Sequence, residues 1–220
     1  MHPTPVYDTV VFDLDGTLLD TLGDLAASTN AALAAYGLPP RAIGEVRQFV
    51  GNGVRRLMEL AVPGGAQHPR FEAVLAAFKA HYSAHCQDTT APYPGILEML
   101  DTLDSRGFKL AIVSNKFDAA VKQLSAQYFG ARLPVAIGEQ EGVRKKPAPD
   151  SVLRALRELG SSPRRAVYVG DSDVDVLTAR NAGLEGIAVG WGFRSEAQLR
   201  AAGARRIVHT PAQLLAALGV

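Results

Sequence analysis

Two aspartates separated by one leucine follow an apolar run near the start of the chain, within the sequence FDLDGTL. On an extended strand end, Asp13 and Asp15 point to the same side while Leu14 points away. One carboxylate could attack a phosphorus atom as a nucleophile, and the other could protonate the departing oxygen and later deprotonate water. Gly16 would let the backbone turn sharply beside a ligand. The spacing fits phosphoryl-transfer chemistry, although a lone DxDG also fits an ordinary surface turn.

Polar residues also follow two later apolar runs. Ser114-Asn115-Lys116 ends one of them, and the sequence GDSDVD at 170–175 ends another. Ligands of open α/β sheets bind outside the carboxyl ends of the strands, so these residues are expected to gather at one edge. Acidic side chains packed together in a partly dry cleft repel each other strongly and require a cation. Mg²⁺ is the natural candidate, because it prefers a few carboxylates together with water and substrate phosphate.

The elements that must position these residues are short apolar runs without alternation. Such runs are typical of parallel strands covered on both faces. Helical patterns separate most of them, for example 150–160 and 174–183, each of which ends in a glycine suited to a left-handed cap. The sequence therefore predicts an α/β fold with a parallel sheet and helices on both faces. The predicted strands are TVVFDL, KLAIVSN, PVAIGE, AVYVGD and GIAVG, with a weaker sixth, RIVHT.

One long interval has no convincing strand. Between the first strand and KLAIVSN, apolar residues at helical spacing run from Leu22 to Tyr36 and again from Phe71 to Tyr82. These patterns predict a mostly helical insert at 19–91, placed directly after the strand that bears the paired aspartates. Residues 1–18 and 92–220 would then form the α/β core.

Four segments together resemble a known family. FDLDGTL, the strand ending in Ser114, the KKPAP segment and GDSDVD are similar, in order, to the four motifs of the haloacid dehalogenase superfamily. The resemblance covers nearly the whole chain. It implies a Rossmann-like core with a small cap inserted after the first motif, and Mg²⁺ as cofactor. The cap would close over the site and exclude bulk water.

The resemblance also implies a role for each matching position. Lys145 adjoins the motif lysine, and only spacing to the prolines selects Lys146. The implied catalytic roles are Asp13 as nucleophile and metal ligand, Asp15 as general acid/base with its backbone carbonyl on the metal, Ser114 as a hydrogen-bond donor to a phosphoryl oxygen, and Lys146 as the cation that neutralises the phosphoryl group. Asp171 would be a direct metal ligand, and Asp175 would act through water or as an orienting group. Gly16, Thr17 and Asn115 would also contact the substrate.

Part of the predicted cap resembles phosphoglycolate phosphatases. The sequence VGNGVRRL at 50–57 is similar to that branch, as are PYPG at 92–95 and Ser114-Asn115-Lys116. Amides at Gly51 and Gly53 could approach an anion, and Arg55 or Arg56 could meet a carboxylate bidentately. The same letters equally fit a loop followed by a helix with exposed arginines. 2-Phosphoglycolate is the predicted substrate.

Other functions stay open at this point. Related capped enzymes hydrolyse pyrophosphate or sugar phosphates, and one branch is a β-phosphoglucomutase that isomerises glucose phosphates. A receiver-like signalling domain also surrounds a phosphorylatable aspartate with acidic groups, a hydroxyl and a lysine. In a receiver, however, the acidic pair is adjacent, and its fold does not explain the helical insert.

Bulk composition narrows the partners. The 220 residues include 23 basic and 22 acidic side chains, a formal charge of +1, which gives no reason to expect nucleic acid or a membrane surface as partner. The single cysteine, Cys86, fits a reducing compartment. No signal peptide or spanning segment is recognisable. We expect a cytoplasmic enzyme, monomer or homodimer, that acts on a small phosphorylated metabolite.

Overall fold

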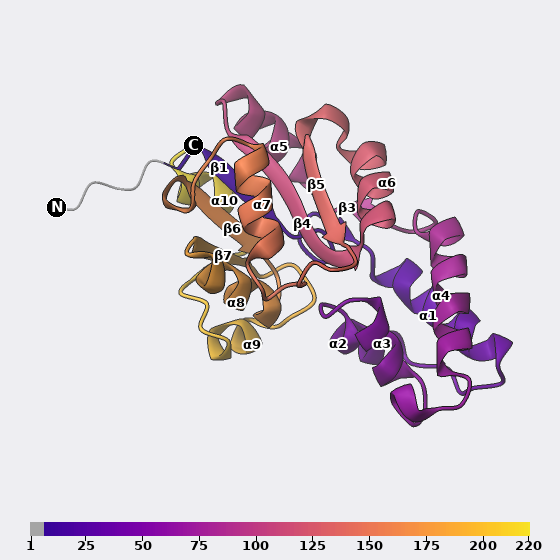
Figure 1. The fold of residues 1–220 in the computed structure, drawn as a ribbon. Helices are drawn as coiled ribbons and strands as arrows, with labels where there is room; N and C mark the ends of the chain where they lie inside the picture. The colour runs from indigo at the N-terminus through magenta and orange to yellow at the C-terminus, as the bar shows by residue number, and fades with distance from the viewer. Residues whose placement is uncertain (1–6) are drawn as a thin grey trace.

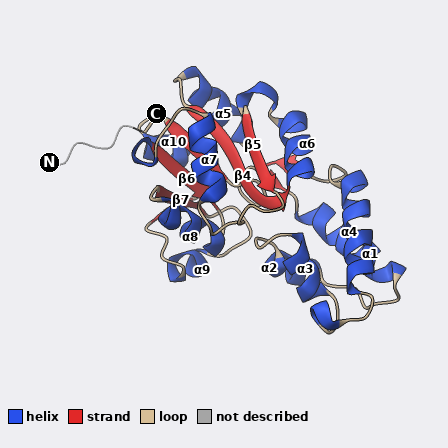
Figure 2. Cartoon of the chain, in the orientation of Figure 1, coloured by secondary structure: helices blue, strands red, loops and turns tan. Residues whose placement is uncertain are grey.

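A six-stranded parallel sheet forms the centre of the protein, whose computed structural model describes residues 7–220. The strand order is β5-β4-β1-β6-β7-β8, so that the first strand lies between the strands that carry the other polar ends (Figures 1 and 2). The predicted parallel α/β architecture, including the weak sixth strand, is confirmed. The strands are β1 (Thr9–Phe12), β4 (Lys109–Phe117), β5 (Val135–Glu139), β6 (Ala166–Gly170), β7 (Glu185–Val189) and β8 (Arg206–Val208).

Helices cover both faces of this sheet. Side chains of β1 alternate, so that Val10 and Phe12 enter one buried cluster and Val11 enters another. The first cluster is completed by α5 (Ile96–Ser105), α6 (Asp118–Tyr128) and α10 (Pro211–Leu218), and the second by α7 (Asp150–Glu158) and α8 (Asp173–Ala182). A short helix, α9 (Glu196–Ala201), follows β7. Burial on both faces explains why the strands read as continuous apolar runs.

Four helices form a separate lobe beside the carboxyl edge of the sheet (Figure 1). We call α1–α4 the helical lobe. Its inner surface is built from the apolar faces that the sequence predicted, with Leu25, Leu33, Phe78 and Tyr82 all buried. The helices are α1 (Leu22–Ala35), α2 (Ile43–Phe49), α3 (Val54–Ala61) and α4 (Phe71–His85).

Two short strands connect the lobe to the sheet. β2 (Leu19–Asp20) and β3 (Ala91–Pro92) pair antiparallel, one on each side of the lobe in the chain. The expectation of no strand between β1 and β4 is therefore wrong. A strand of two residues is too short to show any periodicity in a sequence, which explains the miss.

A buried aspartate ties the start of the lobe to its end. Asp24, in the first turn of α1, accepts four hydrogen bonds. The donors are the backbone N–H and the hydroxyl of Thr89, at 2.8 and 2.5 Å, and the same groups of Thr90, at 3.0 and 2.7 Å. Although burial alone would raise the pKa of Asp24, these hydrogen bonds lower it below its usual value.

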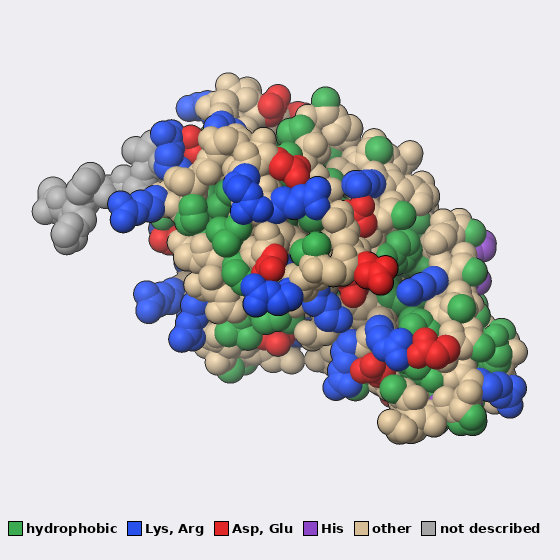
Figure 3. All heavy atoms as spheres, in the orientation of Figure 1, with side chains coloured by type: hydrophobic (Ala, Val, Ile, Leu, Met, Phe, Trp, Pro, Cys, Tyr) green, Lys and Arg blue, Asp and Glu red, His purple; other side chains and the backbone are tan. Residues whose placement is uncertain are grey.

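On the face shown in Figure 3, basic and acidic side chains are interspersed. Within residues 7–220, no helix has the length and apolarity that crossing a bilayer demands.

Candidate active site

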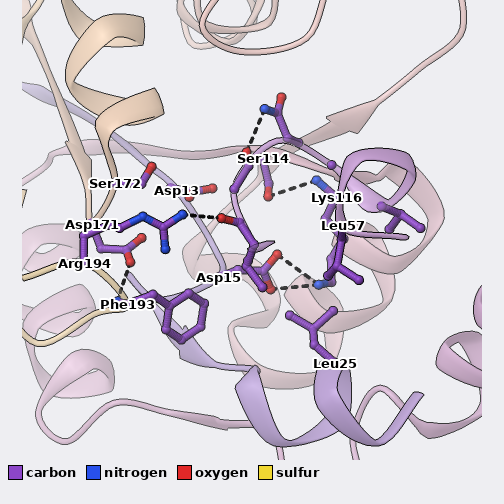
Figure 4. Close-up of a pocket in the computed structure, with 15 residues that line it drawn as sticks. Asp13, Asp15, Leu25, Leu57, Ser114, Lys116, Asp171, Ser172, Phe193 and Arg194 are labelled. Carbon is purple, nitrogen blue, oxygen red and sulfur yellow. Dashed lines mark hydrogen bonds and ion pairs between the residues drawn. The ribbon is translucent and has the colours of Figure 1, made fainter. Parts of the chain in front are cut away.

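The carboxyl ends of three neighbouring strands bring the predicted site residues together. Asp13 follows β1 directly, Ser114 lies near the end of β4, and Asp171 follows β6. β1 is paired with both neighbours in parallel, Phe12 opposite Ile112 on one side and Val169 on the other. The three side chains therefore meet at one edge of the sheet and line the same pocket (Figure 4).

Three buried carboxylates cluster at this edge of the sheet, and two of them, Asp13 and Asp171, line the pocket. One oxygen each of Asp13, Asp171 and Asp175 lies within 4.8 Å of the others. Asp175 is placed by the start of α8, where its Oδ2 accepts from the backbone N–H of Ser172 at 3.0 Å. The Ser172 hydroxyl accepts in return from the N–H of Asp175 at 3.3 Å, which completes a capping box.

Mutual repulsion and burial disturb these carboxyl groups. Burial, followed by the charge of Asp175, raises the pKa of Asp13 to about 7. Burial and the charges of Asp175 and Asp13 likewise raise the pKa of Asp171 well above its usual value. An all-oxygen donor set of three carboxylates beside one lysine fits a hard divalent cation such as Mg²⁺.

Lys146 provides the cation beside the carboxylates. Its Nζ lies 2.8 Å from Oδ1 of Asp13 and 2.8 Å from Oδ1 of Asp175, and it donates to the hydroxyl of Tyr168 at 2.9 Å. Burial alone would lower the pKa of Lys146, but the charges of Asp13 and Asp175 raise it well above its usual value. Because Oδ1 of Asp175 contacts Lys146 and its Oδ2 accepts from Ser172, the arrangement favours an orienting role for Asp175.

Asn115 fixes the loop that carries Lys146. Its Oδ1 accepts from the N–H of Lys146 at 2.8 Å, and its Nδ2 donates to the carbonyls of Lys146 and Gly51, both at 3.0 Å. The Asn115 side chain thus holds three parts of the protein together: β4, the lysine loop and the helical lobe. Asn115, which was predicted to contact the substrate, also lines the pocket.

Gly16 and Thr17 pack against Asp171. Gly16 has a φ of +80°, and a Cβ at this position would lie 2.4 Å from Oδ2 of Asp171. Glycine is therefore required both by the backbone conformation and by the closeness of the carboxylate. The buried Thr17 hydroxyl lies 3.4 Å from Oδ1 of Asp171, a long hydrogen bond.

Asp15 is turned toward the base of the helical lobe. Its Oδ1 accepts from the hydroxyl of Thr21 at 2.7 Å and from Nζ of Lys116 at 2.8 Å, and its Oδ2 accepts from the same Nζ at 3.0 Å (Figure 4). Lys116 is 4 % exposed, and its ammonium lies 4.6 Å from the centre of the Tyr82 ring on α4. No role was predicted for this lysine. Its place two residues after Ser114 on one strand could have indicated that both side chains face the same edge.

The helical lobe contributes an apolar wall and two glycines. Gly51 and Gly53 line the pocket with Val50, Val54 and Leu57. Gly53 has a φ of +83°, and a Cβ there would lie 3.2 Å from the carbonyl oxygen of Asn115, so the lobe approaches β4 closely at this point.

Arg55 does not reach the pocket. It lies on the outer side of α3, half exposed, where its guanidinium pairs with Glu72 at 2.6 Å and covers the Phe71 ring. Arg56 is also half exposed and pairs with Glu59 at 3.2 Å. The structure thus separates the two predicted carboxylate-reading arginines from Asp13.

A second arginine pair, absent from the sequence prediction, joins the lobe to the core. The buried Arg194, in the loop after β7, donates to the carbonyls of Arg47 at 2.8 Å and Val50 at 2.6 Å. Arg47 on α2 donates in return to the carbonyls of Gly192 at 2.7 Å and Phe193 at 2.9 Å. The N–H of Phe193 donates to Oδ2 of Asp171 at 2.6 Å, so this loop connects the lobe directly to the carboxylate cluster.

Comparison with known proteins agrees with this fold. The profile of the family described as haloacid dehalogenase-like hydrolase matches residues 10–189. The chain belongs to this family.

Several similar proteins carry more specific names than the family. Phosphoglycolate phosphatase 1 of Pseudomonas aeruginosa is 37% identical over 190 residues, which is 84% of this chain and 70% of that protein. N-acetylmuramic acid 6-phosphate phosphatase of the same organism is 35% identical over 84% of this chain and 82% of its own length. A crystal structure from Lactobacillus delbrueckii subsp. bulgaricus, provisionally assigned as a phosphoglycolate phosphatase, superposes with a TM-score of 0.91 at 36% identity and covers 96% of this chain and 98% of that one.

Proposed function

We propose that the protein is a Mg²⁺-dependent phosphomonoesterase that acts through a phosphorylated Asp13, with 2-phosphoglycolate as its substrate. The observation that carries the proposal is the contact of buried Lys146 with Asp13, inside a cluster of three carboxylates at the carboxyl edge of the sheet. That cluster brings together a nucleophile, a cation and a metal-suited donor set, the parts that phosphoryl transfer needs.

Asp13 is the nucleophile in this proposal. A carboxylate oxygen of Asp13 attacks phosphorus, the bond to the ester oxygen breaks, and an aspartyl-phosphate forms. Lys146 offsets the negative charge of the phosphoryl group, and the Ser114 hydroxyl, which lines the pocket, donates to one of its oxygens. Water then attacks the same phosphorus and releases inorganic phosphate and the free Asp13 carboxylate.

Asp15 moves protons in both steps. It donates a proton to the departing ester oxygen and later removes one from the attacking water. Because the structure shows its carboxylate turned toward Thr21 and Lys116, Asp15 must rotate toward the ester oxygen to act.

Asp13, Asp171 and the backbone carbonyl of Asp15 would hold Mg²⁺, with Asp175 orienting Lys146. When bound, the ion supplies positive charge that stabilises the developing charge on phosphoryl oxygens. Asp13 and Asp171 would also lose the repulsion that raises their pKa values.

The helical lobe is the proposed cap. Its apolar wall of Val50, Val54 and Leu57 faces the carboxylates across the pocket, which would exclude bulk water during transfer. The choice of 2-phosphoglycolate is supported by the similarity to phosphoglycolate phosphatase 1 of Pseudomonas aeruginosa. The relative named for N-acetylmuramic acid 6-phosphate makes a sugar phosphate the alternative.

Phosphate release tests the proposal. Purified protein is supplied with 2-phosphoglycolate, N-acetylmuramic acid 6-phosphate, hexose phosphates and pyrophosphate, each with Mg²⁺ or with a chelator. We expect continuous release, the highest kcat/KM for 2-phosphoglycolate, and loss of release in chelator. Asp13→Asn should lower kcat by about 10⁴-fold or more while the protein stays folded. Turnover by folded Asp13→Asn, or a single phosphorylation without release, would contradict the proposal.

A further inference from the structure

Lys116 is a buried cation that the mechanism above does not use. It lines the pocket from β4, and its Nζ contacts both carboxylate oxygens of Asp15, at 2.8 and 3.0 Å (Figure 4). The Tyr82 ring of α4 covers it from the lobe side at 4.6 Å. The ion pair with Asp15 offsets the cost of burying this ammonium, so an event that moves Asp15 away leaves a buried cation in need of another anion.

The other basic groups near the pocket are committed to the protein. Lys146 contacts Asp13, Asp175 and the Tyr168 hydroxyl. Arg194 lines the pocket too, but its guanidinium donates to three carbonyls of the lobe: those of Arg47, Gln48 and Val50. Lys116, by contrast, is held by the side chain of Asp15, the group that must rotate away for catalysis.

The reach of Lys116 can be set against the length of a substrate. When Asp15 acts, its carboxyl oxygen and the ester oxygen lie about 2.7 Å apart. In the resting position seen in the structure, the Asp15 carboxylate lies a similar distance from Nζ of Lys116. In a glycolate ester the carboxylate carbon is two bonds from the ester oxygen, which places the carboxylate oxygens about 3 Å from it. We therefore expect the substrate carboxylate to take the place that the resting Asp15 carboxylate has beside Lys116.

We propose that Lys116 recognises the carboxylate of 2-phosphoglycolate, which replaces Asp15 as the acceptor of the Lys116 ammonium. This inference rests on the proposed function and gives it a substrate-reading residue in place of the distant Arg55. Because the exchange frees Asp15, substrates with an anion two bonds from the ester oxygen release the general acid as they bind. Lys116 is thus a specificity residue that lies in the core and not in the cap.

A series of three substrates tests the length argument on the unaltered protein. 2-Phosphoglycolate is compared with 2-hydroxyethyl phosphate, in which a hydroxymethyl group replaces the carboxylate, and with 3-phosphooxypropanoate, whose carboxylate is one methylene further away. We expect kcat/KM for 2-phosphoglycolate to exceed both others by about 10- to 100-fold, the range of a hydrogen bond to a charged group. Equal values for the three esters would overturn the inference.

Substitution then assigns the preference to Lys116. In Lys116→Met the ratio of kcat/KM for 2-phosphoglycolate over 2-hydroxyethyl phosphate should fall to near one, and Lys116→Arg should retain part of it. Lys122→Met, which changes an exposed lysine on α6, is the matched control and should keep the full ratio. If Lys116→Met slows both substrates equally, Lys116 only positions Asp15, and the inference fails. Thermal melting of each variant verifies folding.

Binding separates this inference from the proposed function. 2-Phosphoglycolate and 2-hydroxyethyl phosphate are each titrated calorimetrically, with Mg²⁺ present, into Asp13→Asn protein and into the Asp13→Asn, Lys116→Met double variant. A preference for 2-phosphoglycolate that disappears with Lys116 supports the inference, and a preference that persists overturns it. If no ester is hydrolysed by the unaltered protein while Lys116 still controls this preference, the proposed function is wrong and the recognition by Lys116 stands.

Discussion

Nζ of Lys146 and Oδ1 of Asp13 lie 2.8 Å apart, and both side chains are buried. The same Nζ contacts Asp175, so one ammonium offsets two carboxylates. Removal of this lysine would leave buried negative charges without this cation. Such a change typically lowers the free energy of unfolding by about 3–5 kcal/mol.

Lys146→Met should therefore reduce both stability and turnover. We expect the free energy of unfolding to fall by about 3 kcal/mol or more, and kcat to fall by about 10²- to 10³-fold because a group that stabilises phosphoryl charge is lost. Chemical denaturation and phosphate release measure the two effects. Lys145→Met, at the neighbouring exposed lysine, is the control. Unchanged kcat in folded Lys146→Met would show that the pair is only structural.

Asp171 should be needed for stabilisation by Mg²⁺. Because burial and repulsion raise the pKa values of Asp171 and Asp13, bound cation should stabilise the folded state, by about 2.7 kcal/mol at a concentration 100 times its Kd. Thermal melting with increasing Mg²⁺ should show a rising Tm in the unaltered protein and none in Asp171→Asn. Asp173→Asn, an exposed change at the first residue of α8, should keep the response. A rise of equal size in Asp171→Asn would place the ion elsewhere.

Arg194 should control closure of the helical lobe. Its guanidinium donates to carbonyls of the lobe, and the preceding residue, Phe193, donates its backbone N–H to Asp171. Arg194→Met leaves these buried carbonyls without donors, so we expect the lobe to open more often and KM to rise by about tenfold. Hydrogen exchange should become faster in α2 and stay unchanged in β1. Slow exchange in α2 of this variant would mean that other contacts hold the lobe.

The sequence was sufficient to predict that Asp13, Ser114 and Asp171 lie together, but it did not predict the side-chain directions of other residues near the site. Asp13, Ser114 and Asp171 end up together because neighbouring parallel strands end at one edge, a rule that needs only strand order. Lys146 lies in a loop before α7, and only the motif resemblance could assign it to the site. The roles of all these residues stay predictions.

Side-chain direction explains what sequence reasoning missed. Arg55 lies on the outer side of α3 because the apolar side of that helix, with Val54 and Leu57, packs inward. The place of Lys116 two residues after Ser114 indicates which edge it faces, but its contact with Asp15 joins segments 101 residues apart and does not follow from that spacing. The contact of Arg194 with Val50 likewise joins segments 144 residues apart. Such contacts are set by tertiary packing and cannot be found from spacing along the chain.

Asp24 should make the protein sensitive to acid. Its folded-state pKa lies below the usual 3.8, because Thr89 and Thr90 donate four hydrogen bonds to its carboxylate. A group with a lowered folded pKa contributes stability that is present above pH 3.8 and is lost as the pH falls through the folded pKa.

Asp24→Asn replaces a carboxylate acceptor by an amide whose NH₂ group faces the threonine donors. We expect it to destabilise the protein by about 1–3 kcal/mol at pH 7. The difference from the unaltered protein should shrink as the pH falls below 3.8, since protonation weakens the native site as well. Denaturation series between pH 7 and pH 3 measure this, with the exposed Asp88→Asn as the control. A difference that stays constant over this range would mean that the charge of Asp24 contributes nothing to folding.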